Sequence, residues 1–291
     1  VEFIPFGGKY YPERLKKIDS PPIGLFTKGN QKLLIGTQII AVVGARKTTS
    51  YGREVTENLV GELCSSGFVI VSGMALGVDG VGHKSAIDNR GSTIAILGCG
   101  VDCPYPRENE KLYEEILDSN GLIVSEYPLG MPANQGTFPA RNRIIAGISM
   151  AVLITEAAED SGSLITAAHA GKQGKPVFAV PGPITSQMSK GSLNLLKQGA
   201  ILVSSAEDIL KELNIKNKIL NIKDTYKKSN INKTEQKIIE CLESEKRTID
   251  EISNLTKIPI AKLSIILSEM ELKGIVKNLS GKFSTSSPAF L

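Results

Sequence analysis

Short apolar runs rich in β-branched residues recur along the first two thirds of the chain, and each is followed by a turn of small residues and a helix-like segment. The runs do not alternate with polar residues, which is typical of strands buried on both faces of a sheet. Because strands and helices alternate, the pattern predicts an α/β fold with a parallel, doubly wound sheet. The predicted strands are Ile39–Val43, Phe68–Val71, Thr93–Leu97, Leu122–Val124, Ala151–Ile154, Pro176–Val180 and Ala200–Val203.

Glycines stand where helix-like segments end and the next strand begins. Glycine adopts the left-handed conformation of a helix C-terminus at little cost, so these positions predict five helix ends. The glycines concerned are Gly67, Gly91, Gly121, Gly174 and Gly199.

The loops after the predicted strands are the expected place for a ligand. In doubly wound sheets, ligands bind beyond the carboxyl ends of the strands. Segments far apart in the sequence are therefore expected to meet there. They are Gly44–Gly52, Ser72–Asp79, Gly98–Asn109, Tyr127–Arg143 and Glu156–Ser163.

The pattern changes on both sides of the sheet region. The first 37 residues are expected to form a wrapping segment with a short edge strand, and residues 214–232, rich in Lys and Asn, are typical of a linker. Three helices and a hairpin then predict a winged helix. The expected division is 1–37, 38–213, 214–232 and 233–291, with helices at Lys233–Ser244, Thr248–Thr256 and Ile260–Lys273.

Length and composition fit two globular domains, since the chain has 291 residues and is 41% hydrophobic. The net charge of +4 is uneven: residues 214–291 hold 14 Lys and Arg against 9 Asp and Glu, and the rest holds 20 against 21. No apolar run approaches the roughly 20 residues that cross a bilayer, and no signal peptide is evident. A soluble, cytoplasmic protein is expected.

The last predicted helix is poorly equipped to read a DNA groove. It carries only Lys262 near its start, and its predicted apolar stripe is Ile260, Leu263, Ile266 and Leu267. A winged helix that binds protein and one that binds DNA weakly both remain open.

Cysteine and histidine do not indicate a metal site. The four cysteines are expected to be reduced, because their number and spacing do not make a disulfide framework. Only Cys99 and Cys103 are close in sequence, and they lack a second ligand pair, so neither a metal nor a cofactor is predicted. No G-x-G-x-x-G or Walker A sequence is present, which argues against NAD binding and ATP hydrolysis.

The segment Phe138–Ile145 holds an aromatic residue and two arginines at the start of an apolar helix. A guanidinium matches phosphate oxygens in pairs and an aromatic face stacks on any base, which suits single-stranded nucleic acid. Burial in the core is the alternative for Phe138, and we favour partial exposure. Arg141 and Arg143 cannot share a helix face, so one is expected to meet the ligand and the other a carboxylate such as Glu126 or Glu156.

Other strand ends offer further contacts with an anion. Arg46 and Lys47 could meet phosphate, the alternative being an exposed basic turn. Ser72-Gly73 could offer free backbone N–H groups, the alternative being close helix packing. Ser161-Gly162-Ser163 opens a helix whose positive end could hold another phosphate. His83 is expected to be structural, because no nucleophile is spaced to use it, and Asp79 is expected to cap or orient the same turn.

Taken together, these motifs closely resemble the bacterial DNA-processing protein A family (DprA/Smf). The resemblance covers about residues 9–213, and the winged helix matches the family's common C-terminal module. It rests on Gly44-Ala45-Arg46, Tyr51-Gly52, Ser72-Gly73, Gly77-Val78-Asp79, Gly98–Asp102, Tyr105-Pro106, Ser125–Pro128, Phe138–Ile145, Ser161–Ala167 and Val180-Pro181-Gly182.

The resemblance implies an extended Rossmann-like domain that binds and protects single-stranded DNA and helps to load the recombinase RecA in natural transformation. It implies a homodimer and no catalytic turnover. Carried over to this chain, it places Arg46 on phosphate, Phe138 against a base and Arg143 in or beside the pocket, with the Ser72 and Ser161 turns as donors. Leu76 departs from the pattern, since relatives often carry a basic residue there, and the chain begins at Val1 without a separate N-terminal helical domain.

Two other classes of function remain open for this sequence. The superfamily also looks similar to nucleoside-monophosphate glycosidases, which need a carboxylate at the scissile bond. The helix after Ser163 has none in Leu164–Ala170, and Glu156 is the nearest substitute. A nucleotide sensor that uses the same pocket is the third class, and strong mononucleotide binding without DNA binding would identify it.

Overall fold

The computed structural model describes residues 1–215, 232–242, 245–272, 275–279 and 281–285. The chain forms two compact units, Val1–Asn217 and Lys218–Leu291. Most of the predicted linker lies outside the described residues. Among the helices that the structure describes, none is both long and apolar enough to cross a membrane.

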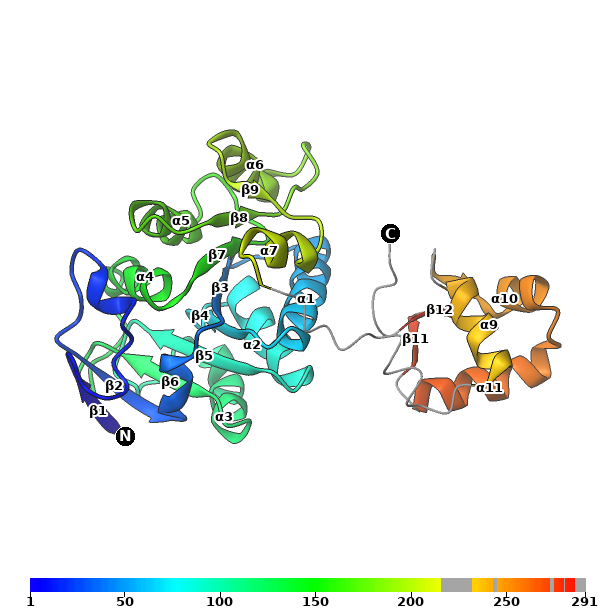
Figure 1. The fold of residues 1–291 in the computed structure, drawn as a ribbon, viewed down its shortest axis with the longest axis horizontal. Helices are drawn as coiled ribbons and strands as arrows, with labels where there is room; N and C mark the ends of the chain where they lie inside the picture. The colour runs from blue at the N-terminus through cyan, green and yellow to red at the C-terminus, as the bar shows by residue number, and fades with distance from the viewer. Residues whose placement is uncertain (216–231, 243–244, 273–274, 280, 286–291) are drawn as a thin grey trace. The chain divides into compact units, whose positions relative to one another are not determined.

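The first unit is built on a nine-stranded sheet with the order β1-β2-β6-β5-β4-β3-β7-β8-β9 (Figure 1). All neighbours from β6 to β9 in this order pair in parallel, while β2 runs antiparallel to β6 and β1 to β2. The strands are β1 (Glu2–Pro5), β2 (Gly24–Gly29), β3 (Ile39–Val43), β4 (Val69–Ser72), β5 (Ser92–Leu97), β6 (Leu122–Ser125), β7 (Ala151–Ile154), β8 (Val177–Ala179) and β9 (Ile201–Leu202).

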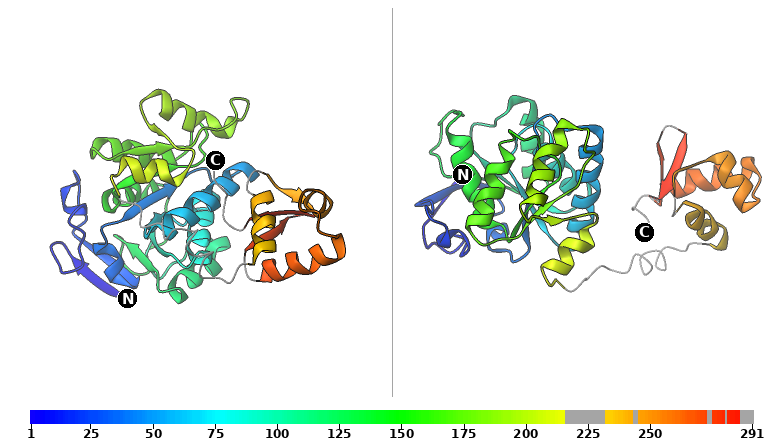
Figure 2. Two further views of the ribbon diagram at one scale, coloured as in Figure 1. Left: turned by 45° about the vertical axis from the view of Figure 1, so that its right-hand side comes forward. Right: turned by 90° about the horizontal axis from the view of Figure 1, so that it is seen from above.

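Helices connect the strands and cover both faces of the sheet (Figure 2). The helices are α1 (Ser50–Ser65), α2 (Val78–Asp88), α3 (Glu110–Asp118), α4 (Thr137–Ile148), α5 (Ser163–Lys172), α6 (Lys190–Lys197) and α7 (Ala206–Glu212). Short 3₁₀ segments lie at Leu15–Lys17, Gln31–Ile35, Arg107–Asn109 and Gln187–Ser189. The parallel, doubly wound architecture predicted from the sequence is confirmed.

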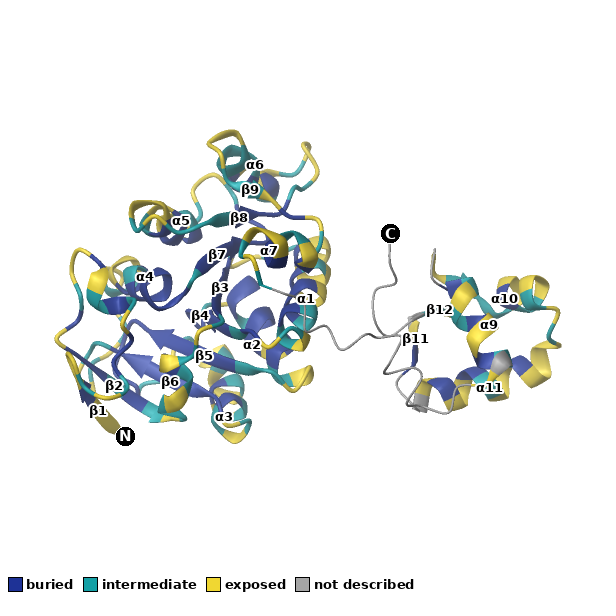
Figure 3. Ribbon diagram, viewed as in Figure 1, coloured by how far each residue is buried: buried dark blue, intermediate teal, exposed yellow. Residues whose placement is uncertain are grey.

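The central strand β3 shows why its apolar run is unbroken. Ile39, Ala41 and Val43 pack with α4, α5 and the first 37 residues, whereas Ile40 and Val42 pack on the opposite face with α1, α2 and α7. All five are buried, because a strand covered on both faces has no side for water. The strands β3 to β7 form the buried centre in Figure 3, and exposed residues lie on the outer sides of the helices.

Two antiparallel strands come from the first 37 residues, where one short edge strand was predicted. β2 extends the sheet beside β6, and β1 forms its outer edge. Leu15 and Leu25 are fully buried in the same core as α4, so this segment contributes to the core of the unit.

The glycine prediction is right at three helix ends and wrong at two. Gly67, Gly174 and Gly199 have left-handed φ angles of 84°, 66° and 96°. At the other two ends the preceding residues, Arg90 and Asn120, take that conformation, with φ of 55° and 60°. Gly91 and Gly121 are needed for space instead. A Cβ on Gly91 would collide with Cys64 Sγ, and one on Gly121 would lie 2.7 Å from the Ile116 carbonyl oxygen.

Within the described residues, the second unit contains three helices and a small sheet ordered β10-β12-β11, which is the predicted winged-helix arrangement. Leu263 and Leu267 are buried as predicted, but Ile260 is 47% exposed, because it stands at the start of its helix outside the core. The elements are α9 (Lys233–Leu242), β10 (Arg247–Thr248), α10 (Ile249–Thr256), α11 (Ile260–Leu272), β11 (Val276–Leu279) and β12 (Lys282–Thr285).

Candidate functional site

The strand order reverses between β3 and β7, so the carboxyl ends of these strands mark the topological switch point of the sheet. From β3 the chain proceeds outward to β4, β5 and β6, and then returns to place β7 on the other side of β3. This switch point is where doubly wound sheets bind ligands. The loops after the two strands are joined there, since the Ala45 N–H donates to the Glu156 carbonyl at 2.7 Å.

An arginine and two aromatic rings lie together after three different strands, since Arg46 follows β3, Tyr105 follows β5 and Phe138 follows β6. The Arg46 guanidinium carbon lies 5.7 Å from the centroid of the Phe138 ring. The Tyr105 ring stacks on Phe138 with a centroid distance of 5.5 Å and an interplanar angle of 27°. Arg46 is exposed, Phe138 is half-buried and Tyr105 is 47% exposed. We call Arg46, Phe138 and Tyr105 the aromatic platform.

The position of Phe138 is fixed by the loop after β5. The Thr137 hydroxyl donates to the Gly98 carbonyl at 2.5 Å, which ties the start of α4 to that loop. A Cβ on Gly98 would lie 2.9 Å from Phe138 Cδ1, so glycine is required for the ring to approach the backbone this closely. Phe138 is thus partly exposed, as predicted, and held by its neighbours.

Arg141 is buried, which corrects its place among the two arginines from which a contact with the ligand was expected. Its side chain is only 4% exposed. Its Nη1 donates to the carbonyl oxygens of Gly73, at 2.6 Å, and Ile96. Burial lowers the pKa of the Arg141 guanidinium, and the charge of Asp79 opposes that shift. Arg141 therefore holds the loop after β4 against the end of β5.

The loop after β4 does not present the free backbone donors that were predicted. The Asp79 carboxylate accepts the N–H groups of Gly73, at 3.0 Å, and Ala75, at 3.4 Å. The Ser72 hydroxyl is buried and donates to the Val42 carbonyl at 2.6 Å. Burial raises the pKa of the Asp79 carboxyl, while the nearby Arg141 lowers it. An internal carboxylate thus occupies this turn, and the prediction that Asp79 orients it is confirmed.

Arg143 is the arginine that meets a carboxylate. Its Nη2 donates to Glu126 Oε1 at 2.6 Å, and the two side chains are 18% and 23% exposed. The expected division of roles is half right: Arg143 pairs with Glu126, but Arg141 is buried and does not reach the surface. Arg143 remains near enough to solvent to contact a ligand beside the pair.

Glu156 occupies the N-terminus of α1. Its carboxylate accepts the Thr48 hydroxyl at 2.9 Å, the Thr49 N–H at 2.8 Å and the Thr49 hydroxyl at 2.6 Å. Its side chain is buried, with 2% exposure. In dinucleotide-binding folds the pyrophosphate lies at this helix end. Here the carboxylate takes that place, which excludes a phosphate from it and commits Glu156 to a structural role.

The remaining predicted residues lie in two places. Lys47 is exposed next to Arg46. In the turn before α5, the hydroxyls of Ser161 and Ser163 are 2.8 Å apart, and the Ser163 N–H donates weakly to Ser161 Oγ at 3.4 Å. The Gly162 carbonyl accepts Asn142 Nδ2 at 3.2 Å, while Gly162 itself is exposed. Some of the hydrogen-bonding groups of this turn are therefore already paired within the protein.

His83 is a buried structural histidine, as predicted. Its Nδ1 and the Thr93 hydroxyl are 2.7 Å apart, and Nε2 has no hydrogen-bond partner among the described residues. Burial, and secondarily the charge of Arg141, lowers the pKa of His83 to about 3. The imidazole is therefore neutral when the chain is folded near neutral pH.

His83 is expected to make the folded chain less stable in acid. In the unfolded chain the imidazole takes up a proton near its ordinary pKa of 6.5, whereas the folded pKa is about 3. Its contribution to stability is complete above pH 6.5 and is lost as the pH falls toward 3. Urea unfolding is measured at a series of pH values. As the pH falls, the free energy of unfolding should decrease more steeply for the wild type than for His83→Gln, whose side chain cannot titrate. Parallel pH profiles would contradict this.

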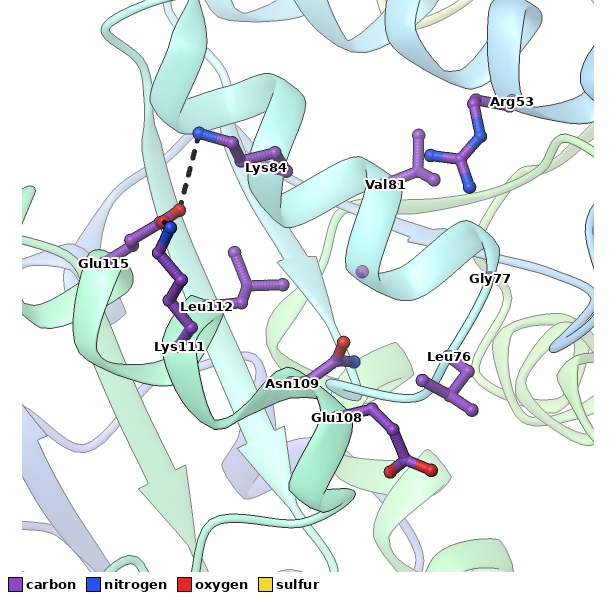
Figure 4. Close-up of a pocket in the computed structure, with 11 residues that line it drawn as sticks. Arg53, Leu76, Gly77, Val81, Lys84, Glu108, Asn109, Lys111, Leu112 and Glu115 are labelled. Carbon is purple, nitrogen blue, oxygen red and sulfur yellow. Dashed lines mark ion pairs between the residues drawn. The ribbon is translucent and has the colours of Figure 1, made fainter.

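A groove of about 370 Å³ lies between α2 and α3, next to the loop after β4 (Figure 4). Leu76 lines it at the position where the family resemblance favours a basic residue. Glu115 of α3 forms ion pairs with Lys84 of α2, at 3.4 Å, and with Lys111 of its own helix, at 3.8 Å. The groove is thus mixed in charge, in contrast to the exposed Arg46 and Lys47.

All four cysteines are free thiols. The buried Cys99 donates to the Cys103 carbonyl at 3.0 Å, and burial raises the pKa of its thiol to about 11. Within the described residues, no group of three or more His, Cys, Asp or Glu side chains is arranged to hold a metal ion.

The sequence places Tyr105 in a motif of the family resemblance but predicts no contact between Tyr105 and a ligand. Its aromatic ring stands in the loop that follows the buried strand β5, and Phe138 follows the buried strand β6 at the start of α4. That shared placement was the available signal, but only the tertiary structure shows that the two rings stack.

Two family models match the chain. The model described as DNA recombination-mediator protein A matches residues 2–214, and the DprA winged helix domain matches residues 227–282. DNA processing protein DprA of Bacillus subtilis (strain 168) is 43% identical over 213 residues, covering 73% of this chain and 71% of that protein. Protein Smf of Escherichia coli (strain K12) is 44% identical over 210 residues, covering 72% of this chain and 56% of that protein.

Solved structures of similar proteins share the fold. DNA processing protein A from Streptococcus pneumoniae superimposes with a TM-score of 0.69 and 40% identity, covering 72% of this chain and 74% of that one. The Helicobacter pylori protein, described for its single-stranded DNA binding mode, has a TM-score of 0.65 and 36% identity, covering 70% of this chain and 92% of that one.

Proposed function

Since the chain belongs to the DNA recombination-mediator protein A family, we propose that it is a cytoplasmic recombination mediator that binds and protects single-stranded DNA. In this proposal it acts as a homodimer and helps to load RecA recombinase during natural transformation. It does so without catalytic turnover.

The observation that carries the proposal is the aromatic platform at the switch point of the sheet. An exposed guanidinium lies over one aromatic ring, and a second ring stacks on it. Single-strand binding proteins combine cations that follow the phosphate backbone with aromatic rings on which bases stack. Lys47 adds a second exposed cation beside Arg46, and Arg143 stands on the same helix as Phe138.

The two internal carboxylates support binding of a polymer over binding of a nucleotide cofactor. Glu156 fills the helix end that would receive a pyrophosphate, and Asp79 fills the next turn. Both carboxylates are buried and hydrogen-bonded, so neither is placed as a free general acid for a glycosidase. The exposed groups of the platform remain as the binding surface.

The direct test is fluorescence anisotropy with a labelled oligo-dT strand and the matching duplex. Hydrolysis of a nucleoside monophosphate is assayed in parallel. Tight binding of the single strand, weak binding of the duplex and no base release are expected. Base release without strand binding would move the chain to the glycosidase class, and mononucleotide binding alone would identify a sensor.

Removal of residues 228–291 is expected to leave the affinity for single-stranded DNA within about threefold of that of the full chain. This corresponds to a change in binding free energy of less than about 1 kcal/mol. The first unit has its own sheet and cores, and it carries the platform. The exposed surface of α11 offers Ile260 and Ile265 with only one lysine, Lys262, which suits DNA poorly. The same anisotropy assay on the shortened chain checks this, and near-complete loss of binding would make the winged helix the binder.

A further inference from the structure

Tyr105 presents the most exposed aromatic ring of the platform. It is 47% exposed, whereas Phe138 is half-buried and has Tyr105 stacked on it. Their centroid distance of 5.5 Å is within the range of rings in direct contact, which leaves no space for a base between them. An incoming base therefore meets Tyr105 on the side that faces away from Phe138.

The loop that carries Tyr105 is anchored on both sides. Before Tyr105, the Tyr113 hydroxyl donates to the Val101 carbonyl at 2.5 Å, and the Cys103 N–H donates to Gly100 at 2.9 Å. After it, Asn109 Nδ2 donates to the carbonyls of Met74 and Ala75, at 2.9 and 3.1 Å. The ring is thus held in place before DNA arrives, which reduces the entropy lost on binding.

The side chain has no other evident task. The Tyr105 hydroxyl makes no hydrogen bond to any residue that the structure describes, unlike the hydroxyls of Tyr11, Tyr51 and Tyr113. A large exposed ring without a polar anchor, supported from behind by a second ring, is the arrangement expected of a stacking surface.

We propose that Tyr105 is a base-stacking residue of the single-stranded DNA site, with Phe138 supporting it from behind. This inference rests on the proposed function. It assigns the outer face of the platform to Tyr105, and it predicts little dependence on base identity because every base has a π-face.

The test measures oligo-dT affinity of the full chain and of Tyr105→Ala, Tyr105→Leu and Tyr105→Phe. The alanine and leucine variants are expected to bind the strand about fivefold or more weakly than the wild type. The phenylalanine variant is expected to bind it as tightly as the wild type. Leucine separates stacking from simple filling of space. Ile23→Ala is the control, because Ile23 is 87% exposed and belongs to the first 37 residues, outside the platform.

A second readout follows from composition. The chain has no tryptophan, so tyrosine emission is directly observable. A base stacked on Tyr105 should quench part of that emission, and Tyr105→Phe should lose this quenching while it keeps its affinity. Persistence of the full quenching in Tyr105→Phe would overturn the inference.

Affinity data also separate this inference from the proposed function. If the wild type binds the strand and Phe138→Ala weakens it, while Tyr105→Ala binds equally or more tightly, Tyr105 only shields Phe138 and the inference fails alone. If the wild type does not bind the strand, the proposed function fails and this inference fails with it.

Discussion

Replacing Arg141 by alanine is expected to lower the free energy of unfolding of the first unit by about 3–5 kcal/mol, because each buried acceptor left without its donor costs about 1–3 kcal/mol. The substitution leaves the carbonyls of Gly73 and Ile96 without their donor and removes the positive charge that compensates the buried Asp79. Leaving a buried polar group without a partner lowers the stability of the fold by more than the net amount that its hydrogen bond contributes.

Urea unfolding followed by tyrosine fluorescence checks this, since six of the seven tyrosines lie within residues 1–215. Arg143→Ala is a matched control two residues away on the same helix. Its guanidinium is 18% exposed and paired with a Glu126 side chain that is 23% exposed, so a cost of about 1 kcal/mol is expected. Equal losses for the two variants would show that Arg141 does not support the loop.

Replacing Phe138 by alanine is expected to weaken binding of oligo-dT by about 5- to 150-fold, equivalent to 1–3 kcal/mol for one stacked base. The variant loses the ring over which Arg46 lies and the support behind Tyr105. One substitution therefore disturbs all three members of the platform. Because Phe138 is half-buried at the start of α4, the fold is expected to persist.

The measurement is anisotropy with a labelled strand, accompanied by a thermal melt to confirm folding. Phe3→Ala is a matched control: Phe3 is 51% exposed and lies 4.9 Å from the ring of Phe26, but it belongs to the edge strand β1. Wild-type affinity in a folded Phe138→Ala variant would remove the platform from the binding site.

The fold was predictable because its signals are local. The bounds of β3 and β7 match the predicted apolar runs, since a strand covered on both faces needs consecutive apolar residues. The edge of the sheet was less predictable. β1 and β2 contribute antiparallel strands whose pairing depends on contacts with β6, almost a hundred residues away along the chain.

The site was only partly predictable because its decisive contacts are long-range. Residues two apart on a helix point about 200° apart, so Arg141 and Arg143 had to face different surroundings. Which one faces inward depends on carbonyl groups 68 and 45 residues away. Likewise, Glu156 meets threonines 107 and 108 residues away, and no local pattern indicates that partnership.

The carboxylate at the start of α1 has a consequence for competition in a cell. The Glu156 carboxylate belongs to the same chain as the helix end that it occupies. A free phosphate therefore has to displace this internal carboxylate, whose effective concentration is on the order of millimolar or higher. Nucleotides and inorganic phosphate at comparable concentrations are therefore expected to leave this position unchanged. Under the proposed function, a long strand gains its affinity from several exposed contacts at once, so it is expected to bind in preference to a mononucleotide.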